Sequence, residues 1–143
     1  MNKIIVILFF LIGLTVQSQD KIYGKWKTVD DNTGEVKGIV EFFEKDGKAH
    51  GRIVKILHPD PVKQKEICSR CKDERKDQLI LGMVVIRDLK EDGKYYRGGK
   101  VLDPEIGREY QCYAKLLDDG KLKLRGYLGI PLIGRTQYWF RDK

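Results

Sequence analysis

Two cysteines separated by two residues are the most reactive feature of the sequence. Cys68 and Cys71 have the spacing of half a zinc site, but no second Cys-x-x-Cys or His-x-His follows. Completing a metal site would require His58 and Cys112, or a partner chain, and Cys112 lies in an alternating segment where a buried thiol is expected. A redox site would need a strand–helix–strand unit, which the sequence lacks. The favoured interpretation is a Cys68–Cys71 disulfide in an oxidising compartment, with Cys112 left as a free thiol.

Other catalytic chemistry is poorly supported. Ser69 is the only serine after residue 18, and a Ser–His–Asp triad would have to use it with His50 or His58. Acidic pairs such as Asp30 and Asp31 occur in turns, where solvated capping is the usual role. No glycine-rich phosphate loop is present. The sequence therefore predicts no catalytic residue, no metal and no cofactor, and favours a protein that is not an enzyme without deciding the question.

Aromatic and polar side chains interleave in the C-terminal half of the chain, and they are the remaining feature that could bind a ligand. On the strands of a small barrel some of them must point inward, where they either fill the interior or surround one small molecule. The sequence leaves both outcomes open. The candidate ligand-binding residues are Trp26, Tyr96, Arg97, Tyr110, Gln137 and Trp139.

Turn signals divide the chain into segments of alternating apolar and polar residues, which is the pattern of half-buried strands. Asp-Gly turns at residues 46–47, 92–93 and 119–120 favour hairpins. Glycines inside the segments indicate bulges or barrel corners. We expect one all-β domain over residues 19–143, an eight-stranded antiparallel up-and-down barrel. The predicted strands are 23–29, 35–44, 49–56, 83–89, 95–102, 108–117, 121–128 and 133–141.

One long loop interrupts this regular spacing. Residues 57–79 lack a strand pattern and contain Pro59, Pro61 and both cysteines of the Cys-x-x-Cys pair. Loops of this length are uncommon in compact domains and are usually functional or disordered. A short helix is expected around residues 73–78.

The N-terminus has the pattern of a signal peptide. An apolar run over residues 4–14 follows Lys3, and Val16 and Ser18 occupy the positions that a signal peptidase reads. The run is shorter than the roughly 20 residues that a membrane span needs, and no later segment predicts a transmembrane span. We expect residues 1–18 to be removed from an exported protein that is periplasmic or secreted.

Composition fits a folded, exported domain. The 143 residues are 41% hydrophobic and 34% charged, with a net charge of +7 that becomes +6 without Lys3. Because basic and acidic residues are interspersed, the sequence does not predict a nucleic-acid interface. Weak contact with an anionic cell envelope remains open through the net charge alone. The sequence makes no prediction of oligomeric state.

Several short motifs resemble those of known families. Gly24-Lys25-Trp26 together with Arg141 is similar to the calycin signature of lipocalins, in which a basic side chain from the last strand covers a tryptophan. The whole mature chain resembles the exported bacterial family called domain of unknown function 2147. This resemblance implies a lipocalin-like barrel and a signal peptide, and it supplies no substrate. The motifs that carry it include Asp46-Gly47, Gly51-Arg52-Ile53, Asp103-Pro104, Gly126-Tyr127 and Gly134-Arg135.

Two functional hypotheses follow. The first is a non-enzymatic binding module for a small, partly apolar molecule or a cell-envelope component. The alternative is a redox or other enzyme that uses the Cys68–Cys71 loop at the barrel mouth. Beside these two, a purely structural envelope or adhesion role stays open. A cavity of a few hundred cubic ångströms with converging polar groups would favour binding, whereas a filled barrel would exclude it.

Overall fold

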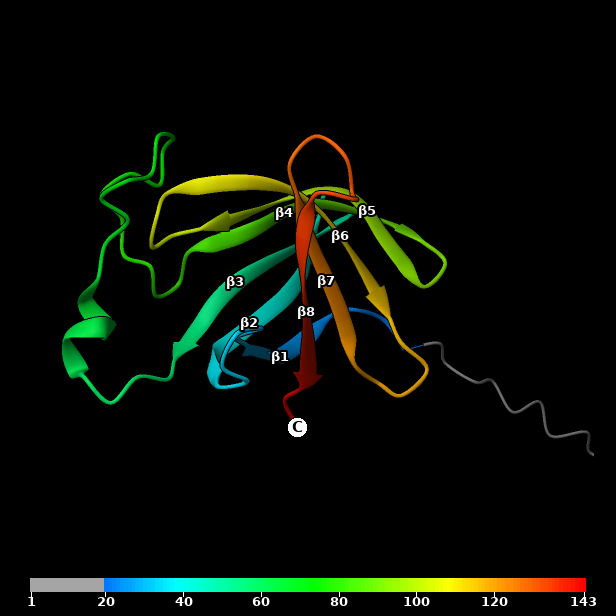
Figure 1. The fold of residues 1–143 in the computed structure, drawn as a ribbon, viewed down its shortest axis with the longest axis horizontal. Coiled ribbons are helices and arrows are strands. Elements are labelled where there is room, and N and C mark those ends of the chain that lie inside the picture. Colours follow the sequence, from blue (N-terminus) through cyan, green and yellow to red (C-terminus); the bar gives the residue numbers. More distant parts are fainter. Residues whose placement is uncertain (1–19) are drawn as a thin grey trace, which may run out of the picture.

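Eight antiparallel strands form a closed barrel in which each strand pairs with its neighbours in sequence and β8 pairs with β1 (Figure 1). The structure, a computed structural model, describes residues 20–143, so the predicted signal peptide lies outside the described residues. The predicted all-β, up-and-down barrel is confirmed. The strands are β1 Gly24–Val29, β2 Val36–Lys45, β3 Lys48–Ile56, β4 Val84–Asp92, β5 Tyr95–Asp103, β6 Arg108–Leu116, β7 Leu122–Tyr127 and β8 Gly134–Arg141.

Glycine permits both the tight turns and the curvature of the barrel. In the β2–β3 hairpin Asp46 and Gly47 have φ angles of 52° and 74°, in the left-handed region that this two-residue turn requires. The β5–β6 register shifts between Tyr96 and Gly99. A Cβ on Gly99 would lie 2.6 Å from a methyl carbon of Leu89, so the strand can bend there only because no side chain is present.

One end of the barrel is closed by the segment that precedes β1. Ile22 and Trp26 are fully buried, and the indole N–H of Trp26 donates to the carbonyl of Ile22 at 2.7 Å. The backbone N–H of Ile22 donates to the hydroxyl of Tyr96 at 3.2 Å. The Arg141 guanidinium lies 4.1 Å from the centre of the Trp26 ring, as predicted. Residues 21–23, which we call the plug, therefore pack with the indole ring and the guanidinium to fill this end of the barrel.

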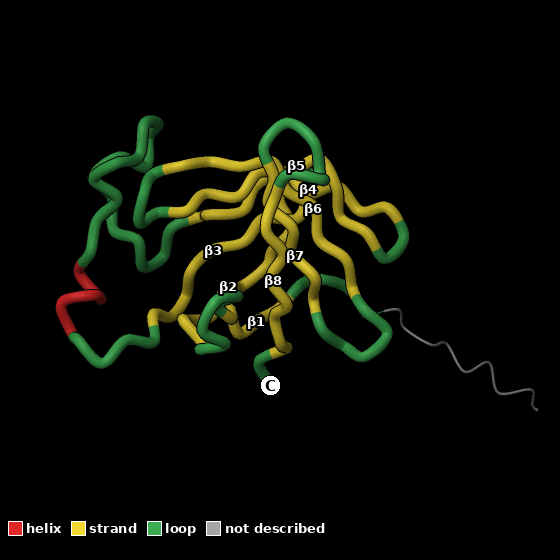
Figure 2. Tube along the Cα trace, in the orientation of Figure 1, coloured by secondary structure: helices red, strands yellow, loops and turns green. Residues whose placement is uncertain are grey.

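The long loop between β3 and β4 contains a single 3₁₀ turn, η1, at Pro61–Lys65, which is the only helix among the described residues (Figure 2). The carboxylate of Asp60 accepts from the N–H of Val62 at 2.9 Å and caps it. The helix predicted around residues 73–78 is wrong, because this segment forms turns. There the Asp73 carboxylate binds the backbone N–H and the guanidinium of Arg75.

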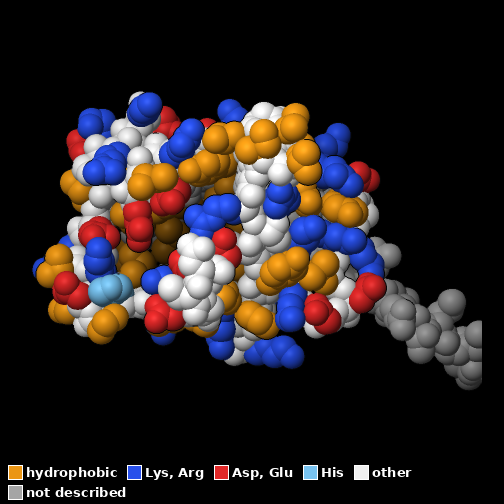
Figure 3. All heavy atoms as spheres, in the orientation of Figure 1, with side chains coloured by type: hydrophobic (Ala, Val, Ile, Leu, Met, Phe, Trp, Pro, Cys, Tyr) orange, Lys and Arg blue, Asp and Glu red, His pale blue; other side chains and the backbone are white. Residues whose placement is uncertain are grey.

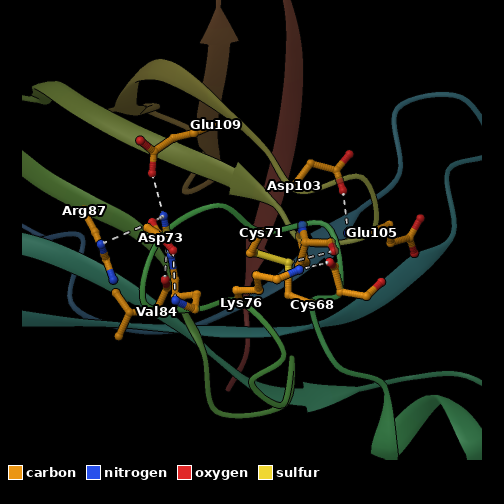
Figure 4. Close-up of a disulfide and its surroundings, with 12 residues drawn as sticks. Cys68, Cys71, Asp73, Lys76, Val84, Arg87, Asp103, Glu105 and Glu109 are labelled. Atoms are coloured by element: carbon orange, nitrogen blue, oxygen red, sulfur yellow. Dashed lines mark hydrogen bonds and ion pairs between the residues drawn. A yellow bond between two sulfur atoms is a disulfide. The ribbon is translucent and has the colours of Figure 1, made fainter.

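The disulfide between Cys68 and Cys71 is present, as predicted, and both residues are buried (Figure 4). Its turn packs against the β5–β6 connection, where the Cys68 sulfur lies 3.3 Å from the carbonyl oxygen of Pro104. A Cβ on Gly107 would lie 2.1 Å from the carbonyl oxygen of Arg70. This close approach holds the disulfide turn against the rim of the barrel.

A buried arginine ties the same loop to the barrel wall. Arg75 is 5% exposed, and its guanidinium bonds Asp73 at 2.6 Å, Glu109 of β6 at 2.7 Å and the carbonyl of Val84 at 3.0 Å. The guanidinium lowers the pKa of Asp73 to about 2. Figure 4 shows Asp73, Val84 and Glu109 around this point. The long loop is therefore a fixed part of the fold over this segment, and its length does not make it a loose lid.

Candidate functional site

The barrel encloses a cavity of about 740 Å³. It opens at the end of the barrel opposite Trp26, where the connections β1–β2, β3–β4, β5–β6 and β7–β8 meet. Figure 3 shows the hollow between the long loop and the rest of the barrel, with hydrophobic side chains inside it and charged side chains around its edge. The described barrel is therefore not filled by its own side chains at this end.

The inner wall of the cavity is mainly apolar because inward positions alternate with outward ones along each strand. These positions carry aliphatic residues on most of the strands and one indole on β8. Gly126 adds open space, since a Cβ there would meet its nearest atom, a methyl carbon of Val101, only at 3.4 Å. The apolar lining residues include Val40, Ile53, Val85, Val101, Leu124 and Trp139.

A chain of hydrogen bonds crosses one side of the cavity. Trp139, Gln137 and Arg135 occupy alternate positions of β8, so they share its inward face. The indole N–H of Trp139 donates to the Gln137 amide oxygen at 2.9 Å, and the Gln137 amide nitrogen donates to Asp31 at 3.3 Å. Arg135 bonds both oxygens of Asp31, at 3.0 and 2.5 Å. This pairing lowers the pKa of Asp31, which therefore stays ionised.

These side chains bridge a seam in the barrel. β1 and β8 pair only at Trp26 with Arg141 and Lys27 with Phe140, both near the closed end. Towards the mouth the two strands are connected by the contacts of Asp31 with β8. The Asp31–Arg135 pair thus acts as a side-chain latch where the backbone ladder ends.

Charged side chains of both signs surround the mouth. Lys63 and Glu66 pair at 2.6 Å on one side of it. The other cationic lining residues are Lys37, Lys55 and Arg135, and the acidic ones are Asp30, Asp103 and Glu105. An apolar interior below a polar, mixed-charge rim suits a molecule with an apolar body and a polar end.

The six predicted ligand-binding residues lie in three different places. Tyr110, Gln137 and Trp139 line the cavity. The structure places Trp26 and Tyr96 in the closed end, where burial raises the pKa of Tyr96. Arg97 is exposed on the outside of the barrel, with its guanidinium 3.9 Å from the centre of the Tyr95 ring. Adjacent strand residues such as Tyr96 and Arg97 face opposite sides, so both could not line one cavity.

Asp31 and Arg135 were missed as site residues by the sequence argument, which assigned Asp31 to a solvated turn. Asp30 does have that role, since it accepts from the N–H groups of Asn32 and Thr33. The barrel topology could have revealed this pair. In a closed barrel the end of the first strand and the start of the last one are neighbours, which brings Asp31 close to Arg135.

The remaining candidates for chemistry lie apart from one another. His58 accepts from the N–H of Asp60 at the mouth, whereas His50 stacks on Phe43 on the outside of the barrel. Cys112 is a buried free thiol, as predicted, and desolvation raises its pKa to about 12. Within residues 20–143 no three His, Cys, Asp or Glu side chains are grouped so that they could hold a metal ion. The same residues contain no helix long and apolar enough to cross a membrane.

Comparison with known proteins agrees with this architecture. The family model described as "Uncharacterized protein conserved in bacteria (DUF2147)" matches residues 24–141. A solved structure described as protein HP1028 from Helicobacter pylori, of the lipocalin family, superposes with a TM-score of 0.76. It is 20% identical, and the match covers 87% of this chain and 85% of that one. No curated protein matches the chain significantly. At this identity the likeness shows a lipocalin-like fold and nothing finer.

Proposed function

This chain belongs to the bacterial family DUF2147, and we propose that it is an exported, non-enzymatic protein that binds one small, partly apolar molecule inside its lipocalin-like barrel. The observation that carries the proposal is the cavity of about 740 Å³, open at one end and apolar within. Pockets for small molecules typically measure about 300–1,000 Å³ and combine apolar walls with a few polar groups.

The wall indicates how such a molecule would lie. Its apolar body would occupy the space near Val101, Leu124 and Trp139, below the mouth. Tyr110 and Gln137 supply polar atoms at the side of the cavity, and the charged rim suits a polar end that stays near water. Because Gln137 already bonds Asp31 and Trp139, its amide is held in one orientation before a ligand arrives, which lowers the entropy cost of binding.

The alternative of a redox enzyme is less consistent with the geometry. Cys68 is 0% and Cys71 2% exposed, and thiol–disulfide exchange requires a thiolate to reach one sulfur. The disulfide also lies in a turn and not at a helix N-terminus, where a reactive Cys-x-x-Cys gains its low pKa. The bond therefore has a structural role in this proposal.

The direct test is native mass spectrometry of the protein purified from its own host. A retained small molecule of defined mass, lost on denaturation, is the expected result. In parallel, N-phenyl-1-naphthylamine, an uncharged apolar dye, would be titrated while energy transfer from tryptophan is recorded, because Trp139 lines the cavity.

A cavity-filling variant makes the second test specific. Gly126→Leu adds a side chain that points towards Val101 and Tyr110, so dye affinity should fall at least about tenfold. Gln111→Leu, on the outward side of β6, adds a similar apolar side chain elsewhere and is the matched control. Absence of a retained molecule together with equal dye binding by both variants would refute binding in the cavity.

A further inference from the structure

We propose that the outward face of β6, β7 and β8, together with the β7–β8 loop, is a docking surface for an anionic phospholipid bilayer. The proposal concerns the outside of the barrel and does not depend on what the cavity holds. In Figure 3 hydrophobic side chains cover the loop at the top of the molecule, and Lys and Arg side chains lie beside and below it.

The loop carries three exposed apolar side chains, among them the most exposed large apolar side chain of the described residues. Leu132 is 84% exposed, and Ile133 and Ile130 are 62% and 53% exposed. Large apolar side chains that gather on a surface mark an interaction site more often than scattered ones do.

Backbone hydrogen bonds and one arginine side chain hold this loop in place. The Arg125 guanidinium donates to the carbonyls of Pro131 at 2.6 Å and Leu132 at 3.3 Å, and to the hydroxyl of Thr136 at 2.7 Å. The fold thus uses the donors of an arginine to present apolar side chains to the outside. A rigid loop of this kind loses little conformational entropy when it enters an apolar phase.

Basic and aromatic side chains cover the adjoining strands. Outward positions form cross-strand rows in which Tyr113 lies beside Arg125, and Lys115 and Tyr138 lie on either side of Lys123. The three strands carry a single acidic residue, Glu109, which lies at the mouth end of β6 and is bound to the buried Arg75. The outward positions of these three strands therefore carry a net positive charge.

The lysine pair is a second, independent sign of an anionic partner. Lys115 and Lys123 are direct cross-strand neighbours, an arrangement that destabilises a sheet. Within residues 20–143 neither has a carboxylate within 4.0 Å; instead Lys115 lies 4.9 Å from the Tyr95 ring centre and Lys123 lies 5.8 Å from that of Tyr113. An anion placed across both ammonium groups would relieve their repulsion.

The combination favours a bilayer over a soluble polyanion. A nucleic acid or acidic polysaccharide would satisfy the lysines but would leave Ile130, Leu132 and Ile133 in water. At a bilayer these side chains would enter the acyl region, while tyrosine and lysine lie at the level of the headgroups. Since Leu128 and Ile133 also line the cavity, the barrel mouth would lie next to the lipid.

The test is sedimentation with vesicles, using protein purified from cells that express the full chain. Vesicles of phosphatidylcholine with about 30% phosphatidylglycerol should bind the protein, and binding should weaken in 0.5 M NaCl; pure phosphatidylcholine should bind much less. Each lysine removed from the headgroup level should weaken binding about fivefold, so Lys115→Ala/Lys123→Ala should lose about 25-fold. Leu132→Ser should also weaken binding. In Leu132→Trp, brominated acyl chains should quench the fluorescence of the introduced tryptophan.

Two matched control variants test whether the location of the substituted residues matters, and not only the change in charge or apolar surface. Lys45 and Lys48 form another cross-strand lysine pair, in the β2–β3 hairpin, and Lys45→Ala/Lys48→Ala changes the net charge equally. Val62 is 65% exposed on η1, so Val62→Ser matches Leu132→Ser. Equal losses in controls and test variants, no binding to anionic vesicles, or binding to heparin or DNA without binding to vesicles would each overturn the proposal.

Discussion

Trp26 and Arg141 show how a single pair of residues closes one end of the barrel. The guanidinium lies over the indole ring and also donates to the carbonyls of Tyr23 at 2.7 Å and Lys21 at 2.8 Å. It therefore satisfies two backbone acceptors of the plug while it covers the ring. Arginine suits this position because its planar donors can bond two acceptors and stack at the same time.

Loss of either residue should destabilise the fold. We expect Trp26→Ala to lower the free energy of unfolding by about 3–5 kcal/mol, since it empties a fully buried site. Arg141→Ala should lower it by about 1–2 kcal/mol through the lost ring contact and hydrogen bonds. Urea unfolding measures both changes. Arg97→Ala is the control, because Arg97 also covers a ring but is exposed, and a loss as large as that of Arg141→Ala would contradict the explanation.

Asp73 should make stability depend on acid pH. Its folded-state pKa of about 2 lies below the ordinary value of 3.8 because Arg75 stabilises the carboxylate. The contribution of the ionised Asp73 to the free energy of unfolding is therefore complete above pH 3.8, and it is lost as the pH falls towards 2. Over this pH range the Asp73→Asn variant should lose less free energy of unfolding than the parent, as measured by acid unfolding curves. Asp46→Asn, in the exposed β2–β3 turn, should retain the parent's curve, and identical curves for all three proteins would count against the assignment.

At the scale of elements, local sequence predicted the strands because each alternating segment is bounded by a turn of recognisable chemistry. All eight strands lie within three residues of the expected bounds. The predicted helix was placed in the wrong part of the loop. The short 3₁₀ turn starts at Asp60-Pro61, where Asp60 caps it, whereas the Asp73 carboxylate binds Arg75. Contacts of Arg75 with Glu109, and of Gly107 with Arg70, join segments distant in sequence, so no local pattern could reveal how the loop is fixed.

The disulfide should shape the loop more than it stabilises the barrel. In the chain-entropy model, closing a ring of about four residues contributes only about 2 kcal/mol. Cys68→Ser/Cys71→Ser should therefore remain folded, with faster amide exchange concentrated in residues 57–83. Alkylation of the unfolded, unreduced parent should label Cys112 alone. Uniformly faster exchange across all strands, or labelling of all three cysteines, would show that the bond has another role.

At the scale of the whole molecule, the barrel combines a closed end, a cavity and a seam. The resemblance to the calycin signature predicted that Arg141 covers Trp26, but the sequence left the cavity undecided. Whether a barrel is hollow depends on the summed volume of inward side chains and on strand bends, such as that at Gly99, which shift which residues point inward. The latch between Asp31 and Arg135 likewise exists only after the last strand lies beside the first.

Opening this latch should loosen one side of the cavity. Asp31→Asn removes the charge that Arg135 binds, so amides of residues 134–138 should exchange faster while those of β4 and β5 stay protected. Because the pKa of Asp31 is lowered, protonation at sufficiently acid pH should have the same effect, and neutral pH should keep the latch closed. Asp30→Asn preserves a turn cap and is the matched control. Equal exchange in the two variants would rule out the latch.

The contact between Arg141 and the plug also sets when the barrel can finish folding. It joins residues 118 and 120 positions apart in the chain, among the most sequence-distant contacts that a chain of this length can make. Such contacts slow folding, because the intervening chain must be ordered before they form. A nascent chain whose last strand is still being synthesised lacks the side chain that covers Trp26. The barrel therefore cannot close around its cavity until the last strand has been released, which delays the capture of any molecule until the whole polypeptide is free.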